Sequence, residues 1–204
     1  MTTRTGILPK APLVNAISVV RFAPILKLPE FLPNIQHKLR ERFPETFQMK
    51  LQVSSNDNPV VTWGFLDSNL SMACTISNDV LLLNSMCYET FPLHAEIFKF
   101  CLESLIAEVK FIDVTGIGMR YVDIIEPRDN ETLQNYLPDN FIPMSGIYDG
   151  VEPEGIASTT YSTNEAFLHV RCWRQTGNPV PDDLADQGMI FDIARQHKLA
   201  QNPK

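Results

Sequence analysis

Hydrophobic and polar residues alternate in short runs along most of the chain, and two longer stretches repeat with a helical period. Residues 13–22 (LVNAISVVRF) are rich in β-branched side chains and lie between two prolines, which is typical of a strand. Residues 31–43 place four large apolar side chains at helical spacing, and Pro44 ends the pattern. Further strands are predicted over residues 48–53, 60–66 and 70–77.

A second series of elements follows in the same order. Residues 80–88 (VLLLNSMCY) are apolar enough for a central strand, and Thr90 is a candidate cap for a helix that runs to about Lys110. An apolar stripe marks the side of that helix that should be buried. More elements are predicted after it: strands at 115–125, 156–161, 166–174 and 189–193, a short helix at 132–137, and a loop at 138–153.

These two series predict an α+β fold in a single domain that spans residues 1–204. Each helix needs a sheet face to cover its apolar stripe. Two strand–helix–strand–strand units could therefore join edge to edge in one mainly antiparallel, curved sheet with both helices on one side. The pseudo-duplicated halves would be residues 12–77 and 78–194, although they share no convincing sequence identity. The alternative is a sheet that wraps around the single long helix near residues 91–110.

Charge and hydropathy exclude several classes of function. The formal net charge of −7 argues against a nucleic-acid-binding protein, because phosphate contacts require concentrated Lys and Arg. The densest basic cluster, Lys38, Arg40 and Arg42, is interrupted by a glutamate and is expected to be a solvated helix face. No apolar run approaches the length of a membrane helix, and the amino terminus lacks the apolar core of a secretory signal. We therefore expect a cytoplasmic protein without membrane contact.

Cysteine and histidine residues do not form a pattern of metal ligands. No two cysteines have the CxxC spacing, and each falls in an apolar pattern, so free buried thiols and no zinc are expected. The cysteines are Cys74, Cys87, Cys101 and Cys172. His37 and His94 lie early in the two predicted helices among polar neighbours, which predicts that both are on the surface. No metal or other cofactor is expected.

Motifs of common catalytic sites are also missing from the sequence. There is no GxSxG elbow for a serine nucleophile and no GxxxxGK loop for a phosphate. Gly116 and Gly118 do not begin a GxGxxG motif, because Tyr121 occupies the place of the third glycine. They indicate a bend in a strand or a close approach of another backbone. The sequence therefore favours a protein that is not an enzyme.

The strand at residues 115–125 carries an arginine between apolar residues. Alternation places Arg120 and Tyr121 on opposite faces of that strand, and Asp123 on the face of Tyr121. A guanidinium group in a central strand must find carboxylates or carbonyls, because a buried unpaired charge is costly. Arg120 and Tyr121 are therefore candidate ligand-binding residues for an anionic ligand. The other interpretation, a structural ion pair beneath the sheet, is the commoner outcome for such an arginine.

A second candidate cluster lies in the late strand at residues 166–174. His169, Arg171 and Trp173 alternate along one face of it, while apolar residues occupy the other. Trp and Arg are enriched where proteins bind each other, so these three residues are candidate protein-binding residues. A solvated sheet face explains the pattern nearly as well.

Several segments together resemble a bacterial family known as sporadically distributed uncharacterised proteins. They are PLVNAISVVRF, TWGF, VLLLNSMCYETF and GIGMRYVDII, and the resemblance covers about residues 12–125. The family usually has Tyr-x-x-aromatic at the start of the helix, as at residues 88–91, and an Arg-Tyr-Ile-Asn-like strand. Asp123 stands where Asn is usual. Members commonly have a further helix after the Phe-Asp-Ile strand, whereas a short polar tail follows residues 191–193 here, which implies either a shortened member or a sequence cut before that helix.

Three hypotheses of different classes follow. The resemblance implies a patchily distributed, mobile gene, so the first is a non-enzymatic protein-binding module, such as an immunity, antitoxin or defence component. Its acidic charge would suit contact with a basic partner protein, and a homo-oligomer is also compatible with the sequence. The second is a small-ligand-binding sensor with a pocket between sheet and helices, into which Arg120 or Tyr121 reaches. The third is an enzyme of unknown class that uses Arg120, Asp123 or His169.

Overall fold

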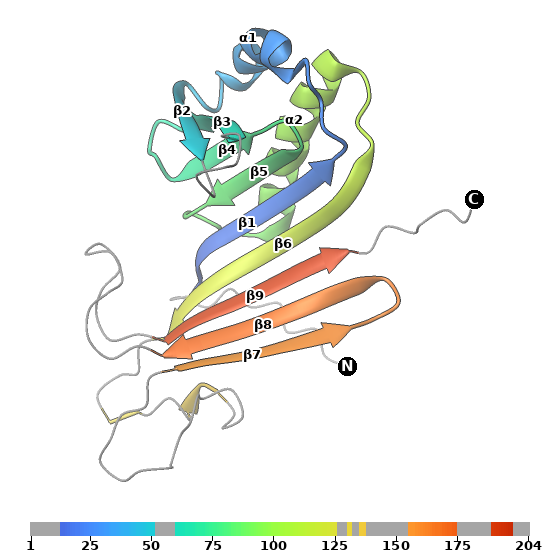
Figure 1. The fold of residues 1–204 in the computed structure, drawn as a ribbon. Helices are drawn as coiled ribbons and strands as arrows, with labels where there is room; N and C mark the ends of the chain where they lie inside the picture. Colours follow the sequence, from blue (N-terminus) through green and yellow to red (C-terminus); the bar gives the residue numbers. More distant parts are fainter. Residues whose placement is uncertain are drawn as a thin grey trace.

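A nine-stranded antiparallel sheet forms the frame of the computed structural model (Figure 1). The structure describes residues 13–51, 60–125, 130–131, 135–137, 155–174 and 189–197. For residues 49–51, 60, 155, 173–174 and 189–197 it describes the backbone alone. The order of strands across the sheet is β2-β3-β4-β5-β1-β6-β9-β8-β7.

The strands are β1 (Leu13–Phe22), β2 (Glu45–Leu51), β3 (Val60–Leu66), β4 (Met72–Ile76), β5 (Val80–Ser85), β6 (Val114–Ile125), β7 (Gly155–Ser162), β8 (Ala166–Arg174) and β9 (Met189–His197). The helices are α1 (Leu28–Leu39) and α2 (Phe91–Val109). The side chain of Thr90 caps the start of α2 by accepting from the Leu93 backbone N–H.

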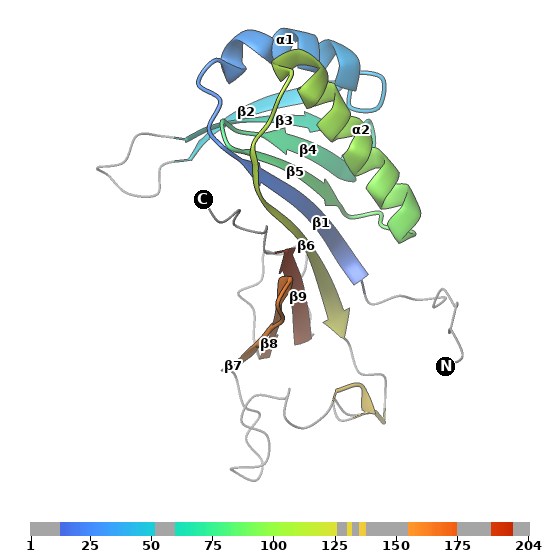
Figure 2. The same ribbon diagram turned by 90° about the vertical axis from the view of Figure 1, so that its right-hand side faces the viewer.

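Both helices cover the same face of the sheet, over β1 to β5 (Figure 2). Alternate residues of the strands point at them, as in β1, where Val20 and Phe22 are buried and Arg21 is exposed. Ile35 of α1 and Leu105 of α2 are fully buried and join these strand residues in one continuous core. The sheet beyond β6 has no helix over it among the described residues (Figure 1).

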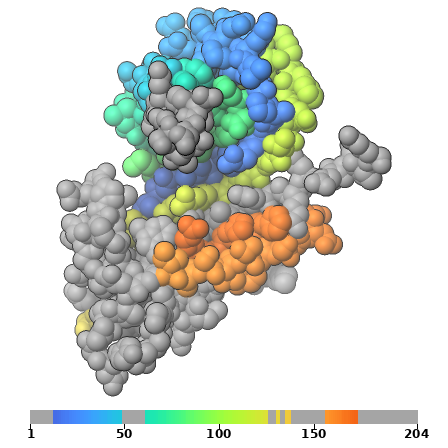
Figure 3. Space-filling model, in the orientation of Figure 1, coloured from blue at the N-terminus to red at the C-terminus, as the bar shows by residue number. Residues whose placement is uncertain are grey.

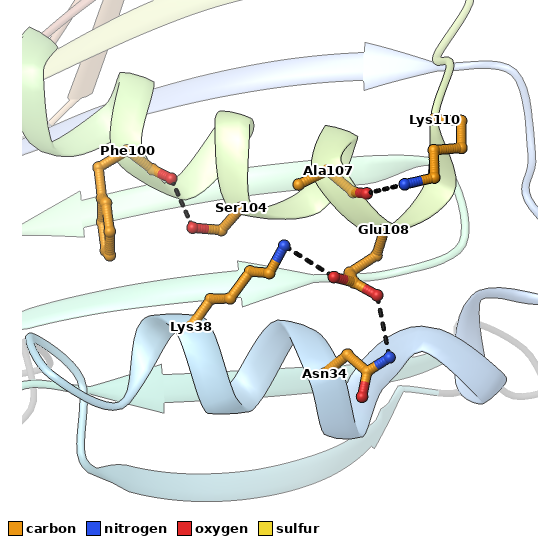
Figure 4. A network of polar contacts seen from close by, with 7 residues as sticks. All are labelled: Asn34, Lys38, Phe100, Ser104, Ala107, Glu108 and Lys110. Carbon is orange, nitrogen blue, oxygen red and sulfur yellow. Dashed lines mark hydrogen bonds and ion pairs between the residues drawn. The ribbon is translucent and has the colours of Figure 1, made fainter.

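Polar contacts fix α1 against α2 (Figure 4). Glu108 of α2 receives the Lys38 ammonium at 2.7 Å and the Asn34 amide at 2.9 Å, and the contact with Lys38, followed by that with Asn34, lowers the pKa of Glu108. Arg42, after the end of α1, reaches Glu96 at 3.2 Å and lies over the Phe100 ring. Lys38 and Arg42 were predicted to lie on a solvated helix face. In the structure both also make contacts with α2.

The α+β class, the antiparallel sheet and the position of both helices on one side are confirmed. The two halves of the chain interleave at the centre of the sheet. β1 of the first half lies between β5 and β6 of the second, and β5 lies between β4 and β1 of the first. The halves therefore share a β1–β5 pair at the centre of the sheet, and this pairing ties them into one structure.

The ends of several elements differ from the sequence prediction. α1 begins before residue 31, because Pro29 fits its first turn, and it ends at Leu39. β4 and β5 are shorter than predicted, and β2 begins three residues before residue 48. The loop predicted at 138–153 and residues 132–134 of the predicted short helix lie outside the described residues.

The turn between β3 and β4 is built around one buried carboxylate. Asp67 accepts hydrogen bonds from the backbone N–H groups of Ser71 and Met72, both at 2.7 Å, and from the Ser71 hydroxyl at 2.8 Å. Leu70 in this turn has a φ of 55°, a left-handed conformation that a leucine adopts only when its surroundings impose it. The turn thus shortens β4 relative to the prediction.

Candidate functional site

The helix-free face of the sheet brings the two candidate clusters together. Strand register places Ile17, Arg120, Ala194, His169 and Thr160 in one row across β1, β6, β9, β8 and β7. Paired residues in an antiparallel sheet share a face. Arg120 and His169 are therefore separated by a single strand, with backbones about 10 Å apart at the usual strand spacing.

Arg171 lies in the next row of the same face. It pairs with Asp192 of β9, which in turn pairs with Val122 of β6, and its side chain is exposed. We call the surface formed by Arg120, His169 and Arg171 the arginine face. These residues lie on strands that are about 50 residues apart in the sequence, so the alternation within one strand could not predict that they share a surface.

The ring of His169 is held by its neighbours. Its Nδ1 lies 2.8 Å from the Thr160 hydroxyl, and the Phe167 ring stacks beside it with centroids 6.2 Å apart. Both neighbours belong to the same face as His169. Because the contact with Thr160 uses Nδ1, the other ring nitrogen, Nε2, is the atom through which His169 can bind a partner.

Trp173 occupies a backbone position one row beyond Arg171, paired with Ile156 and Ile190. Its side chain lies outside the described residues, so its predicted place in a protein-binding surface stays a prediction. Ile156, its neighbour on β7, is 69% exposed. This end of the arginine face therefore has an exposed apolar side chain next to an exposed arginine.

Two asparagines on the same face have unsatisfied oxygens. The Oδ1 atoms of Asn15 and Asn84 are buried and have no hydrogen-bond partner among the described residues. Asn84 pairs with Ile17 and so continues the row of Arg120, and Asn15 pairs with Val122 in the row of Arg171. A buried carbonyl oxygen without a donor is costly, and an N–H donor is the group that would satisfy it.

The charge of the arginine face is opposite to that of the whole chain. Arg21 of β1 is exposed and shares the face, in addition to Arg120 and Arg171. None of the described side chains that β1, β5, β6, β7 and β8 present on this side is acidic, and by register β9 adds one acidic position, Asp192. A chain with a net charge of −7 thus has a local excess of arginine here, which favours an anionic partner.

Tyr121 belongs to a different cluster, on the helix side of the sheet. Its ring meets Tyr88 edge-on, with centroids 5.6 Å apart and hydroxyls 3.4 Å apart. Tyr88 also contacts the ring of His94, whose Nε2 lies 2.9 Å from the Ser18 hydroxyl. Arg120 and Tyr121 thus do not act on one ligand. Burial, with a contribution from Tyr88, raises the pKa of Tyr121, so its phenol stays neutral.

The prediction that His94 is a surface residue is wrong. His94 is 4% exposed, because α2 begins directly above the small residues Ala16, Ser18 and Ser85, which let the helix approach the sheet closely. His37, in contrast, is exposed as predicted. The neighbours of His94 in the sequence gave no signal of this burial. Tyr88 and Tyr121, two residues on which the family resemblance depends, meet beside it.

Replacing His94 with Gln should reduce the dependence of stability on pH. Burial lowers the pKa of His94, so the folded protein resists protonation that the unfolded chain accepts. Stability is therefore complete above pH 6.5, the ordinary value, and is lost as pH falls below it. Between neutral pH and about pH 5, the free energy of unfolding, measured with a chemical denaturant, should fall more for the wild type than for His94→Gln. His37→Gln, at an exposed site, should behave as the wild type; equal slopes for all three proteins would contradict this role of His94.

A hollow of about 340 Å³ lies between the start of α1 and the β2–β3 edge. Trp63 and Phe65 line it from the sheet, and Leu32 lines it from the helix. Trp63 also packs against the core. Neither Arg120 nor Tyr121 lines this hollow, whose polar lining comes from Gln36, Thr46 and Gln48.

The structure also bears on the predictions for metal ligands, cysteines and membrane helices. No group of three or more His, Cys, Asp or Glu residues in the described parts of the chain could hold a metal ion. The four cysteines are free thiols, and Cys87 is exposed, against the prediction that all are buried. Burial raises the pKa of Cys172 to about 11, which makes its thiol unreactive.

None of the helices within the described ranges has the length and hydrophobicity to cross a membrane.

Comparison with known proteins gives no family. The chain matches no protein-family model, and a search of curated proteins finds no match.

Proposed function

We propose that the protein is a non-enzymatic binding protein whose arginine face takes an acidic segment of a partner protein. The observation that carries the proposal is the strand register, which aligns Arg120 and His169 in one row and places Arg171 in the next. Two arginines and a histidine on one face of β6 and β8 offer several cationic or ionisable groups to the carboxylates of an acidic segment.

The exposed apolar side chain of Ile156, on the strand next to that of Arg171, favours a peptide segment over a small anion. A carboxylate or phosphate ion buries no apolar surface, whereas a side chain of a peptide can cover Ile156. In the space-filling view, an uncovered strip of β1 and β6 runs beside the β2–β5 region, and such a strip suits an extended ligand (Figure 3).

The arrangement of titratable groups argues against an enzyme. Arg120 and Asp123 lie on opposite faces of β6, as alternation predicted, so they cannot act on one substrate. The serine–histidine pair of Ser18 with His94 is buried beneath the start of α2, and its members are 7% and 4% exposed. This pair stabilises the contact between α2 and β1, a structural role that requires no access of substrate.

The family resemblance extends the proposal to a biological setting. A sporadically distributed gene is typical of mobile immunity, antitoxin or defence components, which act by binding another protein. We include that role and a cytoplasmic location in the proposal, both of which rest on the sequence.

Photo-crosslinking in the protein's own host tests which face binds the partner. Phe167 on the arginine face and Phe91, 57% exposed at the start of α2, are each replaced by p-benzoylphenylalanine, which changes an aromatic side chain only at its ring. We expect an adduct with another protein from position 167 and not from position 91. The same adduct from position 91, or none from position 167, would reject the arginine face as the binding surface.

A further inference from the structure

β7 is an open edge of the sheet. It is the last strand in the sheet order and pairs with β8 along its whole length, from Gly155 to Ser162, without a shift in register. No other described strand pairs with its outer side. A regular edge strand of eight residues presents a row of backbone donors and acceptors that another strand can pair with.

The sequence of β7 has none of the usual protection of such an edge. Its residues, GIASTTYS, include no charged residue and no proline, which are the devices that commonly prevent edge pairing. Ile156 is 69% exposed and Tyr161 is 49% exposed, and the three residues between Ala157 and Tyr161 are exposed as well. The opposite edge strand, β2, differs, because its sequence ETFQMKL contains Glu45 and Lys50.

We propose that a second copy of this chain pairs antiparallel with β7 and so extends the sheet across a two-fold axis. The chain carries a net charge of −7, and two copies approach each other most easily at an uncharged surface. A two-fold axis makes the same strand the partner of itself, and an uncharged strand meets its own copy without repulsion. A different protein would need charges or pockets for its selection, which this strand does not offer.

Symmetry restricts how the two copies pair. A two-fold axis perpendicular to the sheet leaves the same face of both copies on one side. Odd-numbered residues of β7 therefore pair with odd-numbered residues of the second copy, and even-numbered with even-numbered. Centred on Thr159, it places Ser158 opposite Thr160 of the second copy and Ala157 opposite Tyr161 of the second copy. Thr159 meets its own copy, and such threonine pairs stabilise neighbouring strands. The arginine faces of the two copies would then lie on the same side of one continuous sheet.

The oligomeric state of the full chain tests this inference independently of the proposed function. Sedimentation velocity should show a dimer, and Thr159→Lys should raise its dissociation constant by about 100-fold or more, because two ammonium groups would face each other. Asn69→Lys adds the same charge in an exposed turn and should leave the dimer intact. Circular dichroism should show that Thr159→Lys is folded. A monomeric wild type, or a dimer unchanged by a folded Thr159→Lys, would overturn the inference.

Cysteine crosslinking then tests the antiparallel register. Cys87 is the one exposed cysteine of the four, so Cys87→Ser provides the background. Single cysteines at positions 158, 159 and 160 are oxidised with a mild copper reagent. Self-pairing at one of these positions should give a disulfide dimer there and much less at its neighbours. A dimeric protein with no crosslink at any of the three would show that the copies meet elsewhere, and the inference would fail.

Discussion

Replacing Asp67 with Ala is expected to lower the free energy of unfolding by about 2 kcal/mol, since it leaves two partly buried backbone N–H groups without their charged acceptor. The carboxylate is 7% exposed and accepts from both Ser71 and Met72. These contacts also hold Leu70 in its left-handed conformation. Loss of the carboxylate therefore removes the hydrogen bonds and the support for a strained residue at once. Urea unfolding at neutral pH measures the effect.

Asp79 provides the matched control, because it is an aspartate in the next turn that accepts a single hydroxyl, that of Ser77, at 3.0 Å. Asp79→Ala should cost less than about 1 kcal/mol. Burial alone would raise the pKa of Asp67, but hydrogen bonds from Met72 and Ser71 lower it overall. Its contribution is therefore present above the ordinary value of 3.8 and is lost as pH falls through the lower folded value. Equal costs for both variants at neutral pH would show that the Asp67 contacts do not stabilise the turn.

The architecture followed from patterns that are local in the sequence. β-branched runs between turn residues located the strands, and the predicted bounds of β1 and β3 agree with the structure. Thr90 with Pro92 marked the start of α2. The interleaving of β1 with β5 could not be predicted, because nothing in a strand's own sequence identifies its neighbours. Residues 70–77 have the composition of a strand, and the hydrogen bonds of Asp67 with Ser71 and Met72 turn their start into a loop.

The candidate site was predicted in parts. Alternation correctly separated Arg120 from Tyr121 and grouped His169 with Arg171. Joining Arg120 to His169 required the register of β9, which lies between them and pairs with both strands. His94 was missed because its burial depends on small residues in other strands. A buried histidine has no signature in its own neighbours.

Reversing the charge of Arg171 is the second change with a large expected effect. Arg171→Glu replaces attraction by repulsion toward an acidic segment, and such like-charge contacts cost several kcal/mol, so affinity should fall by about 100-fold at low salt. Arg171 is exposed, which means that the fold should tolerate the change. Arg40→Glu, at an exposed arginine after α1, makes the same change of charge outside the arginine face and should have little effect.

The decisive measurement is the affinity, over a range of salt concentrations, of the protein recovered by crosslinking through position 167. Titration calorimetry would compare the wild type, Arg171→Glu and Arg40→Glu. An acidic segment on the arginine face predicts strong binding that weakens as salt rises for the wild type and Arg40→Glu, and weak binding for Arg171→Glu. Equal affinities of the wild type and Arg171→Glu at low salt would contradict binding through this face.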